Sequence, residues 1–149
     1  MTVDHIMTKK VITISPETPL NEVAALLFDR NLTGVPVIDS EQKVVGIITE
    51  YDLMSPQFKI HIPTFITFLD SLAKHDSESS EYKSQVEKFS QVKARDLMTR
   101  DVIVVHPDTS IRALVEAITT HRINPVPVVD AAGTLVGIVS RADLVRLLK

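Results

Sequence analysis

Two short polar patterns in this sequence combine residue types that could hold a ligand with a phosphate and a sugar. Thr49 follows an apolar run and is followed three residues later by Asp52, and Ser140 and Asp143 repeat that spacing near the C-terminus. A hydroxyl residue that opens a helix lies beside unpaired backbone N–H groups, which suit a phosphate. A carboxylate one turn later can accept both hydroxyls of a ribose. The same spacing is also an ordinary helix cap, and the residues alone leave that alternative open.

Patterns typical of enzymes and of metal sites are missing from the sequence. There is no cysteine, and the five histidines include neither an HExxH motif nor a pair four residues apart. The glycine-rich phosphate loops and the GxSxG nucleophile motif are also missing. We therefore expect a protein that is not an enzyme, has no metal site and requires no cofactor.

Composition and charge narrow the class of partner. The chain has 149 residues, of which 44% are hydrophobic and 23% charged, so it can bury a core. A formal net charge of −3 gives no bulk attraction to nucleic acid or to acidic membranes. The first residues, MTVDHIMTKK, lack the apolar stretch of a secretory signal, and no stretch approaches the roughly 20 apolar residues that span a bilayer. We expect a cytoplasmic protein without nucleic-acid or membrane partners.

An internal repeat is the strongest pattern in the chain. Residues 7–54 align without a gap on residues 98–145, and 15 of the 48 aligned positions are identical. The identities include Met-Thr at the start of each copy, Val-Pro-Val in the middle, and Val-Gly-Ile followed by Asp-Leu at the end. Self-similarity of this length indicates two copies of one supersecondary unit, neither of which can bury its apolar face alone.

Periodicity within the first copy predicts the order strand, helix, strand, strand, helix. Residues 11–14 form a short β-branched run, and residues 20–28 carry a helical stripe that ends with Phe28. Residues 35–38 and 44–48 are typical of two strands joined by a polar turn, and a second helix is expected from Thr49. The second copy repeats this order, and its first helix has the stripe Ile111, Leu114, Val115 and Ile118.

The segment between the copies has no counterpart elsewhere in the chain. A helix could begin at Pro63 and carry an apolar stripe over residues 65–72, and residues 81–92 have a second helical stripe. Such stripes usually pack within a module or across a dimer, and a partner-binding surface is the alternative. The predicted organisation is therefore a first repeat over residues 1–55, a helical insert or linker over residues 56–92, and a second repeat over residues 93–149.

Together these motifs resemble the paired cystathionine-β-synthase (CBS) domains of the Bateman module. The resemblance rests on the start of each copy, the central hydrophobic-Pro-Val-hydrophobic-Asp segment and the closing Gly-x-x-Ser/Thr-x-x-Asp, which occur in the family's order. It covers about residues 3–54 and 94–148. The resemblance implies an α+β fold, of the α/β-type CBS kind, in which two βαββα repeats pack sheet to sheet about a pseudo-twofold axis with two clefts between them.

The same resemblance implies a function in ligand sensing. Modules of this family commonly bind AMP, ADP or ATP, sometimes bind S-adenosylmethionine or other adenosyl compounds, and often pair into disc-shaped dimers. We therefore expect a stand-alone regulatory module that binds an adenine nucleotide, forms a homodimer and signals to a separate effector protein. The alternatives are a module that binds S-adenosylmethionine, and a scaffold for dimerisation or interaction with empty clefts.

Each cleft implied by the resemblance takes residues from both copies. In the first, Asp52 would hold the ribose and Thr49 the phosphate. Its remaining lining would come from Gly34, Val35, Pro36, Thr99, Asp101, Val102 and Ile103. In the second, Asp143 and Ser140 would take these roles, and the lining would come from Arg141, Asn124, Pro125, Val126, Pro127, Thr8, Lys10, Val11 and Ile12.

Charge distinguishes the two expected clefts. In the second cleft Arg141 stands where the first copy has Glu50, and Lys10 stands where the first cleft has Asp101. His121-Arg122 could add further positive charge to a phosphate pocket. A cation beside a phosphate contributes on the order of 1–3 kcal/mol per charge-assisted hydrogen bond. The sequence therefore predicts that the second cleft binds a nucleotide more tightly than the first.

Overall fold

A computed structural model describes residues 1–54, 87 and 90–149 of the chain. The helical insert expected over residues 56–92, including both of its apolar stripes, lies mainly outside the described residues. The two copies of the repeat are therefore the part of the fold that can be compared with the sequence.

Each copy contains a helix, a two-stranded antiparallel sheet and a short closing helix, and this α+β order agrees with the prediction. The first copy consists of α1 (Leu20–Asp29), β1 (Gly34–Ile38), β2 (Val44–Thr49) and α2 (Glu50–Met54). The second consists of α6 (Ile111–His121), β3 (Val126–Val129), β4 (Leu135–Val139) and α7 (Arg141–Arg146). The one-turn helices η1 (Val3–His5) and α5 (Ala94–Leu97) precede the two copies.

The expected strand over residues 11–14 is reduced to a single bridging residue, Ile14, and proline chemistry explains why. Only Ile14 pairs with β1, donating to the Pro36 carbonyl and accepting from Ile38 N–H at 3.1 and 3.0 Å. The next rung of this parallel ladder would need an N–H at Pro36, which proline lacks. The parallel ladder of the second copy ends in the same way. Val105 N–H donates to the Pro127 carbonyl, and Pro127 has no N–H for the next rung.

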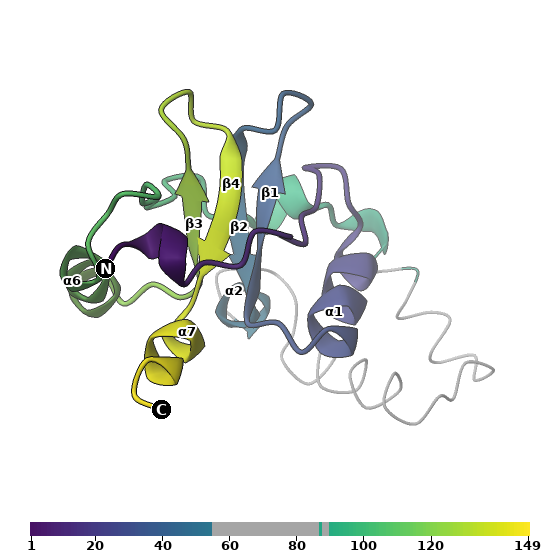
Figure 1. Ribbon diagram of the computed structural model, residues 1–149. Coiled ribbons are helices and arrows are strands. Elements are labelled where there is room, and N and C mark those ends of the chain that lie inside the picture. The colour runs from purple at the N-terminus through teal and green to yellow at the C-terminus, as the bar shows by residue number, and fades with distance from the viewer. Residues whose placement is uncertain (55–86, 88–89) are drawn as a thin grey trace.

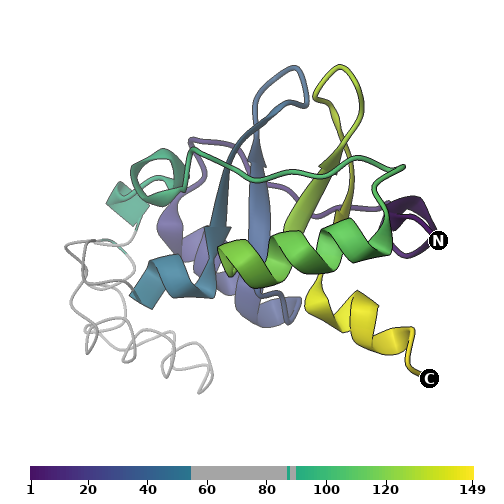
Figure 2. The same cartoon turned by 90° about the vertical axis from the view of Figure 1, so that its left-hand side faces the viewer.

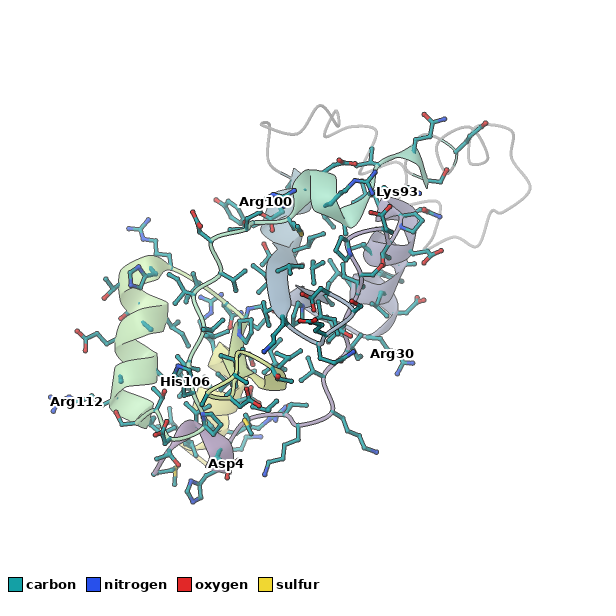
Figure 3. The ribbon with its side chains drawn as sticks, turned by 90° about the horizontal axis from the view of Figure 1, so that it is seen from above. Asp4, Arg30, Lys93, Arg100, His106 and Arg112 are labelled. Carbon is teal, nitrogen blue, oxygen red and sulfur yellow. The ribbon has the colours of Figure 1, made fainter. Side chains whose placement is uncertain are left out.

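Each copy packs against the first residues of the other copy. Val3 N–H donates to Thr109 O at 2.9 Å, and Ala94 N–H donates to Thr18 O at 2.9 Å. Figures 1 and 2 show the purple N-terminal helix beside the second copy, near α6. In the view from above, Asp4 lies at the end of the molecule that also carries Arg112 (Figure 3). The repeats defined by sequence are therefore not the packing units.

Each of the two hydrophobic cores combines residues of one copy with residues from the start of the other copy. The first holds Leu20, Val23, Val35, Val37 and Ile48 of copy one together with Ala94 and Leu97. The second holds Leu114, Ile118, Val126, Val128 and Val139 of copy two together with Val3. Burial of a Val or Leu side chain contributes about 1.5–3 kcal/mol, so each exchanged segment is a structural part of the copy it contacts.

Contacts between equivalent positions mark the pseudo-twofold axis. Lys43 forms an antiparallel bridge with Thr134 at the tips of the two hairpins. Near the other end, a Cβ on Gly34 would lie 2.8 Å from Pro125 Cδ, so only glycine allows this approach. The β1–β2 and β3–β4 hairpins consequently lie side by side, as Figure 1 shows. The expected packing of two sheets about a pseudo-twofold axis is confirmed.

Two expected core positions are wrong. Phe28 of α1 is 54% exposed and Val115 of α6 is 42% exposed, whereas Leu114 and Ile118 are buried. Each helix packs on one side only, against a sheet of two strands. The buried stripe is therefore narrower than the apolar stripe in the sequence.

Candidate functional site

A cavity of about 710 Å³ lies between the two copies, and we call it the Asp52 cavity. Its volume falls within the roughly 300–1,000 Å³ of small-molecule sites. The first copy contributes Thr33, Ile47, Thr49, Glu50, Tyr51, Asp52 and Met54. The second contributes Thr99, Asp101, Val102, Ile103, Ile118, Thr119, Arg122, Ile123, Asn124, Pro125 and Arg141.

Asp52 is held by the residue that begins its helix. One of its carboxylate oxygens, Oδ2, accepts hydrogen bonds from Thr49 N–H at 2.8 Å and from Thr49 Oγ1 at 3.3 Å. The other oxygen, Oδ1, has no hydrogen bond within the described residues. Burial raises the pKa of Asp52, and the hydrogen bonds from Thr49 offset part of that increase. The geometry is a helix cap that, among the described residues, engages only one of the two carboxylate oxygens.

Asp143 has the same cap but a further partner. Its Oδ2 accepts from Ser140 N–H at 2.7 Å and from Ser140 Oγ at 3.0 Å. Its Oδ1 accepts from an Arg146 guanidinium N–H at 3.1 Å. Only 9% of the Asp143 side chain is exposed. The two carboxylates that look equivalent in sequence therefore differ in which oxygens are occupied.

The edge of the Asp52 cavity near Thr99 offers backbone groups. Thr99 and Ile47 exchange two backbone hydrogen bonds of 3.0 Å, which fix the entry of the second copy against β2. Beyond it, Pro127 has no N–H with which to bind the carbonyl of Ile103. Within the described residues, that carbonyl has no backbone hydrogen bond. Ile103 lines the cavity, so its carbonyl is a candidate acceptor for a ligand.

The reciprocal pairing holds the start of the first copy against β4. Thr8 and Ile138 exchange two backbone hydrogen bonds, of 2.8 and 3.0 Å. Thr8 and Lys10 are exposed, and Val11 and Ile12 are half-buried. The segment is thus close to β4, as the second expected cleft requires, although none of these residues lines the Asp52 cavity.

The cationic side chains are not placed as the sequence comparison assumed. Arg141 lines the Asp52 cavity, and its backbone N–H donates to Asn124 Oδ1 at 2.8 Å. Arg122 lines the same cavity. Arg122 also adopts the left-handed conformation, with φ 53°, which costs an L side chain about 1–2 kcal/mol. Two of the cationic residues that were expected to favour the second cleft, Arg141 and Arg122, therefore line the first cleft.

Several expected site residues are buried and do not line the Asp52 cavity. Val35 and Val126 are fully buried, and Gly34, Pro36 and Pro127 are also buried. Side chains alternate along a strand, so a residue between two wall positions can point inward. Asn124 and Pro125, which the sequence assigned to the second cleft, line the Asp52 cavity.

Other lining residues were missed by the sequence reasoning. Thr33 directly precedes the expected Gly34, and Ile47 lies two residues before the expected Thr49. The others, Ile118, Thr119 and Ile123, come from α6 and the segment after it. Helix α6 was assigned to the core alone. The left-handed end of α6 was the signal that this segment turns towards the cavity, but sequence does not show a positive φ at an arginine.

A second hollow, of about 870 Å³, lies on the outer side of the first copy. Its lining includes Glu22, Asp29 and Asp39, and the described lining residues include no lysine or arginine. The Asp39 carboxylate accepts from the N–H groups of Glu41 and Lys43 and so organises the hairpin turn. This hollow has the wrong charge for a phosphate.

None of the helices described is long and apolar enough to cross a membrane. Among the described residues, no group of three or more His, Cys, Asp or Glu side chains could hold a metal ion.

Comparison with known proteins gives one family and close structural neighbours. The CBS domain matches residues 3–57 and 94–149. The uncharacterised protein MJ1426 of Methanocaldococcus jannaschii is 31% identical over 146 residues, which cover 94% of this chain and 87% of that protein. The crystal structure of CBSX2 in complex with AMP, a protein of Arabidopsis thaliana, has a TM-score of 0.72 and 28% identity, covering 99% of this chain and 95% of that one.

A further solved structure contains other adenosyl ligands. The CBS domain pair of protein MJ0100 in complex with 5′-methylthioadenosine and S-adenosyl-L-methionine has a TM-score of 0.71 and 27% identity. The similarity covers 99% of this chain and 95% of that one. The shared architecture thus extends over nearly the whole length of both CBS pairs.

Proposed function

This chain belongs to the CBS domain family as a tandem pair of such domains, and from that premise we propose that it is a regulatory module that binds an adenosyl ligand in the Asp52 cavity. One observation carries the proposal. The cavity is built from both copies and is lined by Asp52, whose Oδ1 has no hydrogen bond among the described residues, and by Arg122 and Arg141, whose side chains carry guanidinium groups. These are the groups that recognise a ribose and a phosphate.

The proposed ligand orientation follows from the chemistry of the walls. The ribose hydroxyls donate to Asp52 Oδ1, the oxygen that Thr49 does not occupy. The adenine lies against the apolar side chains of Val102 and Ile47, and its amino group donates to the carbonyl of Ile103. The phosphate lies towards Arg122 and Arg141. Apolar walls with a few placed polar groups are typical of small-molecule sites.

Charge favours a ligand with one phosphate group. Two guanidinium groups match the charge of about −1.5 to −2 that a phosphate monoester carries near neutral pH. Glu50 and Asp101 also line the cavity and oppose additional negative charge. We therefore propose AMP as a better ligand than ATP, with ADP between them.

A second adenosyl ligand class has specific support. The relative MJ0100 is described with S-adenosylmethionine and 5′-methylthioadenosine. Glu50 and Asp101 could attract the positive charge of S-adenosylmethionine, which would sit near the mouth of the same cavity. The scaffold with empty clefts remains a separate alternative, and the same experiment distinguishes all three.

Regulation would follow from the construction of the cavity. A ligand that contacts both copies can favour one relative arrangement of them, by as much as its affinities for the two arrangements differ. We propose that this change is transmitted to a separate effector protein, in a cytoplasmic homodimer. The enzyme activity under control would then belong to the partner.

Thermal unfolding with a panel of ligands tests the proposed function. AMP, ADP, ATP, adenosine, S-adenosylmethionine and 5′-methylthioadenosine are compared with GMP as the control. A ligand at 100 times its dissociation constant adds about 2.7 kcal/mol to the free energy of unfolding. Stabilisation by AMP above ATP supports the nucleotide proposal, the largest shift with S-adenosylmethionine supports the second class, and no shift with any adenosyl compound supports the scaffold.

A further inference from the structure

The two equivalent carboxylates of the repeat are occupied differently. Asp143 Oδ1 accepts from Arg146 at 3.1 Å, while its Oδ2 accepts two hydrogen bonds from Ser140. Asp52 has the equivalent hydrogen bonds from Thr49 to Oδ2 only. Both oxygens of one carboxylate are therefore engaged, whereas one oxygen of the other has no hydrogen bond within the described residues.

The difference originates in one position of the repeat. The alignment that places Asp52 on Asp143 places Ser55 on Arg146. Serine has no positive charge to offer a carboxylate, so the sequence of the first copy cannot provide the same ion pair. The Arg146 pair joins residues three apart on α7, a spacing at which helical side chains meet.

We propose that Arg146 contributes to the ligand selectivity between the two clefts by occupying the Asp143 oxygen that a ribose would need. This inference rests on the proposed function and deepens it, because it assigns one chain a single favoured adenosyl site, at Asp52. The Asp143 side chain is 9% exposed, so a ribose must displace Arg146 to reach it. Asp52 requires no such displacement within the described residues.

The size of the effect follows from the exposure of the arginine. The Arg146 side chain is 73% exposed, so the ion pair is screened by solvent. An exposed pair of this kind shifts an equilibrium by at most about fivefold. Arg146 therefore weakens the Asp143 site and does not close it.

The test isolates the Asp143 site with the variant Asp52→Asn and then changes Arg146. Adenosine is titrated by calorimetry into Asp52→Asn, into Asp52→Asn/Arg146→Ser and into the control Asp52→Asn/Arg112→Ser. Adenosine has no phosphate, so Arg146 cannot assist its binding through a phosphate contact. Arg112 is an exposed cation on α6 without an ion pair in the described part of the chain, so its removal matches the loss of charge.

We expect Arg146→Ser to increase the adenosine affinity of the Asp143 site about two- to fivefold, and Arg112→Ser to leave it unchanged. Equal affinity in all three proteins, or weaker binding after Arg146→Ser, would overturn the inference. Unfolding of the ligand-free protein gives an independent measure, because Arg146→Ser and Asp143→Asn should show non-additive effects. If the wild-type protein binds no adenosyl compound, the proposed function fails and the selectivity role fails with it. If the wild-type protein binds but Arg146→Ser has no effect, only the selectivity role fails.

Discussion

At the scale of single residues, the burial of the Asp52 carboxylate affects both the stability of the fold and the proposed binding of a ribose. Burial raises its pKa above the ordinary value of 3.8, since the charged form loses hydration. The folded state therefore holds a proton on Asp52 more tightly than the unfolded state. The stability gained in this way is fully present below pH 3.8 and is lost as pH rises through the folded-state pKa.

Acidification should weaken adenosine binding earlier than it would for an exposed aspartate. Ribose hydroxyls donate to the ionised carboxylate, so affinity should fall as pH decreases through the raised pKa of Asp52. Adenosine is the suitable ligand, because the phosphate of AMP titrates near pH 6 by itself, with a pKa of about 6. Calorimetry at pH values between about 4.5 and 7 measures how the adenosine affinity changes, because this range lies above the reference pKa of an aspartate. The profile of Asp52→Asn should be flat, and an equally steep profile for that variant would contradict the assignment.

Arg122 should lower the stability of the fold but raise the affinity for a ligand with a phosphate. Its left-handed conformation (φ 53°) is occupied in the first copy by Asn31 (φ 51°), a residue type that tolerates this region. Arg122→Asn should raise the free energy of unfolding by about 0.5–1 kcal/mol, since strain is relieved. The same variant should bind AMP about tenfold more weakly while adenosine binding stays unchanged, since a charge-assisted hydrogen bond is worth about 1.5–3 kcal/mol.

Denaturant unfolding and calorimetry measure the two effects on one protein. A variant that is more stable and still binds AMP with full affinity would show that Arg122 does not contact the phosphate. Arg112→Asn on the outer face of α6 provides the control for loss of one positive charge.

Residue types and spacing in the sequence predicted the groups that we propose hold the ligand, but not the neighbours of those groups. The Thr49–Asp52 and Ser140–Asp143 pairs could be read from sequence because a helix cap has a fixed spacing. The placement of Arg141 in the Asp52 cavity could not, because it depends on how the two copies face each other. The contact of Arg146 with Asp143 lies within one helix, and its spacing was a signal that the sequence comparison did not use.

At the scale of elements, two glycines allow the reciprocal crossing of the copies. A Cβ on Gly46 would lie 2.5 Å from Met98 Sδ, and a Cβ on Gly137 would lie 2.5 Å from Met7 Sδ. Each methionine belongs to the segment that pairs with the strand of the other copy. The Met and Gly positions of the repeat thus form a close contact between the copies.

The two glycines should differ in their tolerance of alanine. At Gly46 the new methyl group would also lie 2.9 Å from Met98 Cβ, which is fixed by the backbone, whereas at Gly137 the near atoms belong to the flexible end of Met7. Gly46→Ala should reduce the free energy of unfolding by roughly 1–3 kcal/mol, as overpacking does, and Gly137→Ala by less. Chemical denaturation measures both values. Equal losses would show that the Met98 backbone moves as easily as the Met7 side chain.

Helix and strand order was predictable because the apolar periods are clear over residues 20–28 and 44–48. The strand expected at residues 11–14 failed, because the missing N–H of Pro36 ends the ladder at Ile14. That reason is visible in sequence only once the register of the neighbouring strand is known. Phe28 failed for a different reason, since a two-stranded sheet covers less of a helix than its apolar stripe suggests.

At the scale of the whole molecule, the exchange of first segments couples the two copies. The N-terminal residues complete the second core, and residues 94–97 complete the first. A repeat alignment cannot reveal this arrangement, because it does not say which copy a segment packs against. The consequence is that neither repeat should be stable when expressed without the other.

Val3→Ala should act on the second copy. Val3 is fully buried in the core that contains Leu114 and Val139. Its truncation should cost about 1.5–3 kcal/mol, from lost burial and the cavity that remains. Hydrogen exchange should then accelerate first in α6, β3 and β4, more than in α1. Faster exchange in α1 with α6 unchanged would contradict the exchanged arrangement (Figure 2).

The Asp52 cavity as the adenosyl site is tested most directly by titrating AMP into three proteins by calorimetry: wild type, Asp52→Asn and Asp143→Asn. Asn preserves the size of the side chain, removes its charge and replaces one acceptor oxygen by an NH2 donor. We expect a roughly ten- to hundredfold loss of AMP affinity for Asp52→Asn, since a hydrogen bond to a charged group is worth about 1.5–3 kcal/mol, and little change for Asp143→Asn. Unchanged affinity for Asp52→Asn, or a larger loss for Asp143→Asn, would contradict it.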